Sequence, residues 1–169
     1  MSNLGQQNPQ SDPVEALVST FESRGQIATA LGEAARWGRI DLLERLFQTS
    51  GLDVDVRNDF GDTSLILAAS AGQTKAIKYL IDRGANVNLI GGPQSMTPLI
   101  ASVAARHSKG VYLKVCKMLL DAGASQTIGH RDQTGMTALD WAKDGRPAEL
   151  VTLIEKHMSS ETDPSDPHE

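Results

Sequence analysis

Apolar residues in the middle of the chain recur at intervals of three and four. The two clearest series are Leu65, Ala68 and Ala69, followed by Ile77, Leu80 and Ile81. This spacing places the apolar side chains of each series along one side of an α-helix. The pattern therefore predicts two short helices that pack against each other through small alanines.

The same pattern returns along the chain with a period in the thirties. A Thr-x-Leu tripeptide opens each copy, and successive copies start 34, 34 and 40 residues apart. The four copies begin at Thr29, Thr63, Thr97 and Thr137. Such a period is typical of stacked repeats, in which each unit buries its apolar face against its neighbours.

Residues at the borders of each unit suit a helix, a turn and a second helix. The hydroxyl of Thr63 or Thr97 can cap the start of a helix. Pro98 suits the first helical turn, where its missing N–H leaves no hydrogen bond unmade. Gly84 follows the second apolar series and can take the positive φ that ends a helix.

Residues 58–88, "NDFGDTSLILAASAGQTKAIKYLIDRGANVN", resemble an ankyrin repeat over nearly the whole motif. Residues 90–125 and 131–157 match it more loosely, and 29–57 forms a degenerate first copy, so the resemblance covers about three-quarters of the chain. It implies an all-α ankyrin-repeat solenoid of about four helix-turn-helix units with an N-terminal capping helix. Four units exceed the minimum of about three that stable stacking needs.

We expect the repeat domain to span residues 26–157. Its predicted units are about 26–57, 58–90, 91–130 and 131–157. The flanking segments are predicted as a disordered N-terminus (1–11), an N-terminal helix (12–25) and a disordered acidic tail (158–169), which lacks an apolar core and is rich in Pro, Ser and acids.

The segment 12–25 has its own amphipathic pattern. Asp12 is a candidate N-cap and Pro13 suits the first turn. An apolar stripe follows at Val14, Leu17, Val18 and Phe21. One interpretation is a helix that covers the exposed edge of the first unit, and the other is a helix that binds a partner.

The net charge of −5 comes from the ends of the chain. Residues 31–157 contain 15 Lys and Arg and 14 Asp and Glu, whereas 158–169 contain four acids and no Lys or Arg. A near-neutral body without a basic stripe does not attract a phosphate backbone, so we expect no nucleic-acid partner. No apolar run approaches the roughly 20 residues that span a bilayer. We expect a cytoplasmic or nuclear protein, monomeric alone and without a membrane partner.

Few residues offer chemistry. His130, Arg131 and Asp132 share three letters with a kinase catalytic loop, but the chain lacks the other kinase motifs. The four histidines are too scattered for local metal ligation, and Cys116 alone cannot form an internal disulfide. Its helical spacing predicts a small buried core residue. We therefore expect no enzyme, no metal and no cofactor.

The ankyrin resemblance implies a protein-binding concave surface built from hairpin tips and the inner face of each first helix. The positions of this chain that match it are Arg36, Trp37, Asp59, Phe60, Asp62, Ser70, Gln94, Met96, Gln133, Thr134 and Met136. Trp37, Phe60 and Met136 are large apolar groups expected to face outward, and such anchors concentrate binding energy. For Trp37, packing beneath the N-terminal helix is the alternative. Trp141 is expected to be buried against the third unit.

The third unit is irregular. From Thr97 to Gly123 it is five residues longer than the second unit from Thr63 to Gly84. We expect the extra residues, 106–110, to form a longer loop between the two helices, at the end of the unit opposite the hairpin tips. Arg106, His107 and Lys109 would give that loop a secondary contact for an acidic patch of a partner.

The function expected from the sequence is non-catalytic binding of one or more partner proteins through the concave surface. Two alternatives belong to the same fold: a regulatory subunit or inhibitor of an intracellular enzyme or transcription factor, and an escort chaperone for a basic protein, suggested by the acidic tails. A third, from a different class, is an enzyme that uses residues 102–123.

Overall fold

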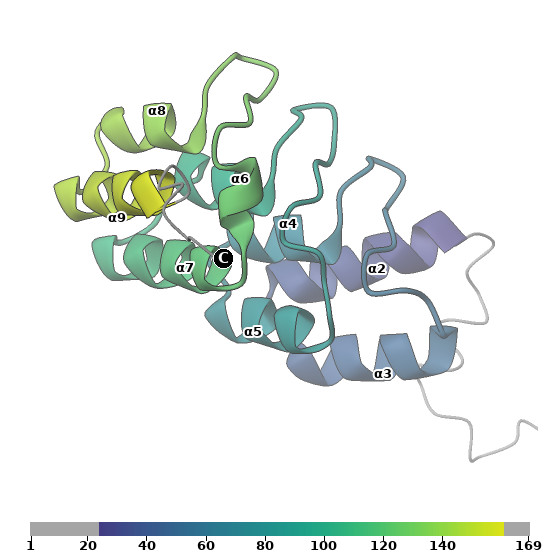
Figure 1. Cartoon of the computed structure of the whole chain (residues 1–169). Helices are drawn as coiled ribbons and strands as arrows, with labels where there is room; N and C mark the ends of the chain where they lie inside the picture. The colour runs from purple at the N-terminus through teal and green to yellow at the C-terminus, as the bar shows by residue number, and fades with distance from the viewer. Residues whose placement is uncertain (1–23, 161–169) are drawn as a thin grey trace, which may run out of the picture.

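The structure is a computed structural model that describes residues 24–160. Within that range eight α-helices and one 3-10 helix alternate with turns, and no strand forms (Figure 1). The elements are α2 (Arg24–Arg36), α3 (Ile40–Ser50), α4 (Ser64–Ser70), α5 (Thr74–Asp82), α6 (Pro98–Ala104), α7 (Lys109–Asp121), η1 (Ala124–Thr127), α8 (Ala138–Lys143) and α9 (Ala148–Ser160). The predicted segment 1–11 lies outside the described residues, as do residues 161–169 of the predicted tail. The predicted helix 12–25 also lies outside them, except for Arg24 and Gly25, which belong to α2.

The helices form two stacked rows. The inner row is α2, α4, α6 and α8, and the outer row is α3, α5, α7 and α9 (Figure 1). Long turns between successive units project to one side of the stack, at the top of the view. The predicted all-α solenoid of four helix-turn-helix units is confirmed. Helix α9 runs to Ser160, past residue 157 where the predicted repeat domain ends.

The Thr of the repeated Thr-x-Leu motif caps the inner helix in three units. The hydroxyl oxygen of Thr63 accepts a hydrogen bond from the N–H of Ile66 at 3.3 Å, and that of Thr97 accepts one from Ile100 at 3.2 Å. Thr137 and Asp140 cap each other's backbone N–H reciprocally. The motif is therefore a helix-start signal, because it supplies acceptors to donors that the helix itself leaves unpaired.

The first unit departs from this scheme. Helix α2 begins at Arg24, upstream of Thr29, which lies inside the helix. The Thr29 hydroxyl donates to the carbonyl of Gly25 at 2.8 Å instead of capping. The partner helix α3 ends at Ser50 and is followed by Gly51, whose φ of 62° is in the left-handed region that favours glycine. The Thr of the degenerate first unit therefore does not serve as the cap that it is in the other three units.

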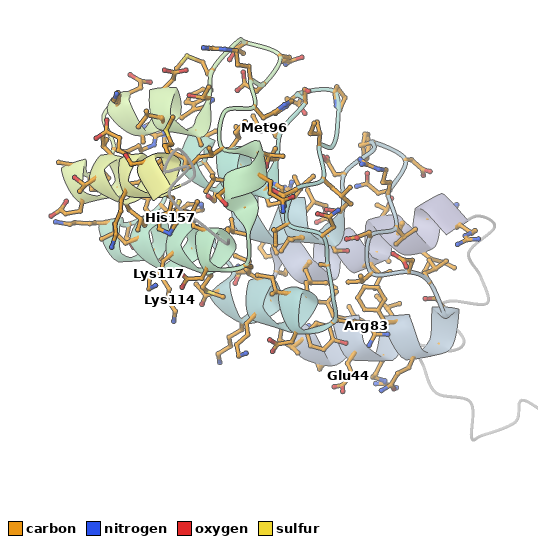
Figure 2. The ribbon with its side chains drawn as sticks, in the orientation of Figure 1. Glu44, Arg83, Met96, Lys114, Lys117 and His157 are labelled. Carbon is orange, nitrogen blue, oxygen red and sulfur yellow. The ribbon has the colours of Figure 1, made fainter. Side chains whose placement is uncertain are left out.

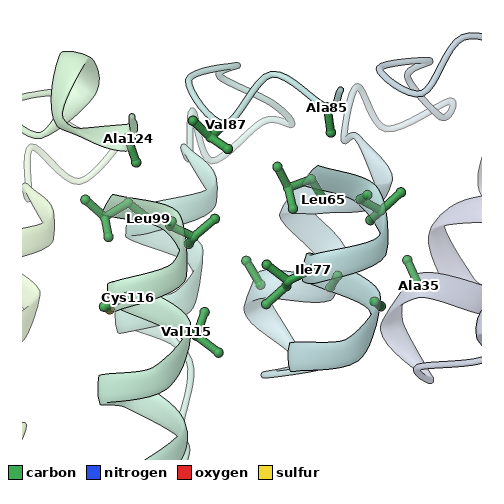
Figure 3. Close-up of a cluster of buried hydrophobic side chains, with 14 of the residues drawn as sticks. Ala35, Leu65, Ile77, Ala85, Val87, Leu99, Val115, Cys116 and Ala124 are labelled. Carbon is green, nitrogen blue, oxygen red and sulfur yellow. The ribbon is translucent and has the colours of Figure 1, made fainter. Parts of the chain in front are cut away.

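One apolar core runs through all four units, and Figure 3 shows the part of it between Ala35 and Ala124. Its largest fully buried side chains are Phe47, Leu31, Leu43, Leu46, Leu65, Ile77, Leu80, Leu99, Ile100, Leu119, Leu150 and Ile154. Alanines such as Ala35 and Ala68 are completely buried between helices, where a small side chain lets the backbones approach closely. Each unit thus depends on its neighbours for burial, as stacked repeats do.

The prediction of a loop over residues 106–110 is wrong in the extent of the loop. Helix α6 ends at Ala104 and α7 begins at Lys109, so Lys109 and Gly110 are helical. Helix α7 has 13 residues where α5 has 9, and most of the extra length of the third unit is therefore one added turn of outer helix.

No described helix is long and apolar enough to cross a membrane.

Candidate functional site

The projecting turn of the second unit is held by Asn58. The buried amide oxygen of this residue accepts hydrogen bonds from the N–H groups of Phe60 at 3.0 Å and Asp62 at 2.9 Å. The N–H of Gly61, at a φ of 83°, donates to the Asn58 carbonyl at 2.9 Å. The tip is therefore fixed by its own hydrogen bonds, and it presents Phe60 with 67 % of its surface exposed.

Asp132 organises the tip of the fourth unit in the same way. Its Oδ1 accepts from the N–H of Thr134 at 2.8 Å and of Met136 at 3.1 Å, and its Oδ2 accepts from the indole N–H of Trp141 at 2.8 Å. Burial acts to raise the pKa of Asp132, but the bonds from Thr134, Trp141 and Met136 outweigh it and lower that pKa. Trp141 is half-buried and bonds within its own unit, in contrast to the expected burial against the third unit.

Successive tips are tied to one another. The N–H of Gly92 donates to the Gly61 carbonyl at 3.2 Å, which links the second tip to the third. The guanidinium of Arg57 donates to the carbonyls of Gly61 and Ile90, both at 2.7 Å. The N–H of Gln133 donates to the carbonyl of Gln94 at 3.0 Å and links the third tip to the fourth. These links give the row of tips one rigid shape.

His130 reinforces the third tip from the fourth unit. Its Nε2 lies 2.8 Å from the Ser95 carbonyl oxygen, and Ser95 has a φ of 54°, unusual for a residue other than glycine. The sequence pointed to neither this contact nor those of Arg57 and Asn58. A signal was available for the tips, since Asn58 and Asp132 occupy the same position before a glycine-containing turn.

A groove separates the second tip from the inner helix of the first unit. It has a volume of about 390 Å³ and is lined by Gln26, Thr29, Ala30, Glu33, Asp59 and Phe60. Glu33 and Asp59 are both exposed, and no Lys or Arg lines the groove. The groove therefore combines an exposed aromatic ring with two carboxylates.

Arg36 and Trp37 lie at the other end of α2. Trp37 has 72 % of its surface exposed, more than Phe60. The segment that was the alternative cover for Trp37 lies outside the described residues. Arg36 is 3.7 Å from the carboxylate of Glu33. It also acts on the second unit: burial raises the pKa of Asp62, while the charges of Arg36 and Arg57 oppose that rise.

The remaining candidate positions divide by exposure. Asp59, Gln94, Gln133 and Thr134 are exposed, whereas Asp62, Ser70, Met96 and Met136 are half-buried. Met136 therefore offers less surface than an outward-facing anchor would. Figure 2 shows Met96 among the projecting turns, on the side of the inner row.

His107 lies between α6 and α7, as expected, but it is half-buried and packs against Tyr112 of the third unit. Its ring meets the Tyr112 ring edge-on, with 5.3 Å between centroids. Burial lowers the pKa of His107, the Ala69 backbone acts to raise it, and the charge of Arg146 lowers it further. Arg106 is exposed, and the amine of Lys109 is 2.6 Å from the carboxylate of Glu149. This region lies at the end of the units opposite the tips.

Cys116 is not placed to act as a nucleophile in the described structure. Cys116 is buried, and this burial raises the pKa of its thiol to about 11, although the hydroxyl of Ser102 at 3.4 Å opposes the rise. The predicted core role of Cys116 is confirmed. Across residues 24–160, no three His, Cys, Asp or Glu side chains gather in a way that could hold a metal ion.

Comparison with known proteins decides the family. The model of the family "Ankyrin repeats (3 copies)" matches residues 31–128, more than half of the chain. The chain belongs to the ankyrin repeat family. Its projecting turns, inner helices and outer helices are those of ankyrin repeats.

Relatives of this ankyrin repeat protein include "Ankyrin repeat, SAM and basic leucine zipper domain-containing protein 1" from several mammals. The chain is 35 % identical to the Bos taurus protein over 136 residues, which are 80 % of the chain and 26 % of that relative. It is 30 % identical to the Mus musculus protein over 131 residues, covering 78 % of the chain and 25 % of the relative. The chain thus spans about a quarter of the length of these relatives.

Proposed function

We propose that this ankyrin repeat protein binds a partner protein through its concave surface, meaning the projecting tips and the exposed side of the inner helices, and performs no catalysis. Ankyrin repeats are generally protein-interaction modules. The observation that carries the proposal is the exposure of Phe60 and Trp37, at 67 % and 72 %. Both belong to the first two units, so the centre of binding lies in the N-terminal half of the surface.

The rigidity of the tips supports this proposal. Phe60 stands on a turn fixed by Asn58, and that turn is bonded to the next one through Gly61 and Gly92. A preorganised aromatic group loses little conformational freedom when a partner covers it. Large aromatic groups that become fully covered at an interface contribute about 2 kcal/mol or more each.

Affinity purification followed by mass spectrometry tests the proposal. The bait is the full chain, compared with the variants Phe60→Ala and Trp37→Ala. Gln48→Ala, at an exposed position of the outer helix α3, is the matched control. Recovery of at least one partner is expected to fall with Phe60→Ala or Trp37→Ala and to persist with Gln48→Ala. If neither aromatic change alters the recovery of any partner, the surface is wrongly placed.

The groove beside Phe60 favours a basic partner segment. No Lys or Arg lines the groove beside its two carboxylates, Glu33 and Asp59, although Arg36 approaches Glu33 to 3.7 Å from outside the groove. A Lys or Arg of the partner would place its alkyl chain along the ring and its charge beside the carboxylates. Escort of a basic protein, or inhibition by covering a basic surface, would follow from such binding. The affinity for the recovered partner is expected to fall with added salt and with Glu33→Gln.

A further inference from the structure

A second groove lies on the other side of the molecule, between the outer helices α5 and α7. Two adjoining hollows of about 510 and 340 Å³ form it, and they share Lys78, Asp82 and Met118. The first hollow begins at Ile40 and Thr74, and the second ends at Asp121 and Ala122. The groove thus follows α5 over its full length of 9 residues, about 13 Å.

The floor of this outer groove is apolar. Its apolar side chains are half-buried and pack against the core from one side while the other side stays open: Ile40, Tyr79, Ile81, Met118 and Ala122. The phenol oxygen of Tyr79 is buried without a hydrogen-bond partner in the described structure. Covering this floor would remove apolar surface from water, which favours association.

The rim of the groove is basic. Lys75, Lys78 and Lys114 line it together with two acids, Asp121 and Asp82, of which Asp82 binds Lys78 at 2.8 Å. Just outside the first hollow, Lys117 binds Asp121 at 2.8 Å. Neither Lys75 nor Lys114 has an ion pair among residues 24–160. Figure 2 shows Lys114 and Lys117 on α7, on the side away from the projecting turns.

We propose that the outer groove binds an amphipathic helix with acidic flanks from a partner protein. Because helices form both walls, their backbone N–H and C=O groups are already paired. A segment in the groove must therefore satisfy its own backbone, and a helix does so. Its apolar stripe would cover Tyr79 and Met118, and its carboxylates would meet the unpaired Lys75 and Lys114.

This site is independent of the concave surface and lies on the opposite row of helices. One protein molecule would then hold two partners at once, a basic segment at Phe60 and an acidic helix at the outer groove. Residues 12–22 of this chain also combine an apolar stripe with acids. The double variant Leu17→Asp with Phe21→Asp, which interrupts that stripe, is expected to leave binding at the groove unchanged; tighter binding would identify this segment as the occupant and overturn the proposal.

A designed peptide tests the proposal. The probe is a capped helix of about 16 residues with leucines at three- and four-residue spacing and glutamates beside them, titrated into the full chain. Saturable binding is expected, with NMR shifts on α5 and α7. The double variant Lys75→Glu with Lys114→Glu is expected to weaken binding about tenfold, whereas Phe60→Ala leaves it unchanged.

The matched control is Arg106→Glu with Lys156→Glu, which changes the net charge equally at exposed positions outside the groove. Equal weakening by both double variants would reduce the effect to overall charge and overturn the proposal. Absence of saturable binding, or equal binding of a peptide with lysines in place of the glutamates, would also overturn it. Self-association of the chain would overturn the proposal as well if Lys75→Glu with Lys114→Glu abolished it, because the occupant of the groove would then be a second copy of the chain.

Discussion

The guanidinium of Arg146 donates a hydrogen bond from Nε to the carbonyl of Val103 at 3.0 Å, across 43 positions of the chain. Its Nη2 donates to the carbonyl of Ala104, also at 3.0 Å, and the hydroxyl of Tyr112 donates to Ala105 at 2.7 Å. Two side chains therefore bind the three carbonyls at the end of α6. Arg146 also lies 5.6 Å from the centre of the Tyr112 ring. This contact joins the fourth repeat to the third.

Replacing Arg146 with alanine is expected to destabilise the fold by about 1–3 kcal/mol, because the carbonyls of a helix end lose a charged donor. Arg146→Lys is expected to recover part of this loss, since an ammonium cannot form the same fork. Urea unfolding followed by circular dichroism measures both. Arg39→Ala, which removes an exposed ion pair with Asp41, is the control and should change the stability little, because solvent screens an exposed pair. If Arg146→Ala and Arg39→Ala lost the same stability, Arg146 would not join the third and fourth repeats as described.

The stability of the fold is expected to depend on the protonation of His107. Its pKa is lowered by burial in the folded state, so the unfolded chain takes up a proton first as the pH falls. The contribution is complete above the unfolded pKa of about 6.5 and is lost as the pH falls from there through the lower folded value. Urea midpoints between pH 7.5 and 5 should fall further for the wild type than for His107→Phe. If the urea midpoints of the wild type and of His107→Phe fell equally with pH, His107 would be solvated in the folded protein.

The Cys116 thiol is expected to resist modification in the native protein. With a pKa of about 11, about one thiol in a thousand is ionised at pH 8, and the group is also buried. A thiol reagent should react slowly until urea unfolds the chain. Because the unfolded pKa is lower, stability should also fall as the pH rises from about 8.5 toward 11, and Cys116→Ala should remove that part of the fall. Fast native labelling would contradict the burial.

The sequence predicted the fold well where each signal is local. The Thr63 and Thr97 caps and the buried series from Leu65 to Leu80 depend on spacing within one unit, and the structure contains them. The extent of α7 was misjudged because Lys109 and Gly110 are exposed in its first turn. Neither position carries an apolar side chain, so the apolar periodicity begins only after the helix has begun.

The candidate surface was predictable in outline but not in its construction. The ankyrin motif gave the positions of Phe60 and Trp37, and both are exposed. The bonds within each tip are local, but the bonds between units join residues far apart, such as Arg57 to Ile90 at 33 positions and Asn88 to Gly123 at 35 positions. Most of these bonds end on backbone carbonyls, which carry no sequence signal. The outer groove was missed because Ile40, Tyr79 and Met118 converge from three separate helices.

Calorimetric titration of a recovered partner with the full chain tests the central claim most directly. The claim is that the exposed ring of Phe60, held on its fixed tip beside α2, anchors a partner protein on the concave surface. Phe60→Ala is expected to weaken the affinity about 30-fold, corresponding to about 2 kcal/mol, and Gln48→Ala to leave it unchanged within about twofold. An affinity that is the same for Phe60→Ala as for the wild type would contradict the account.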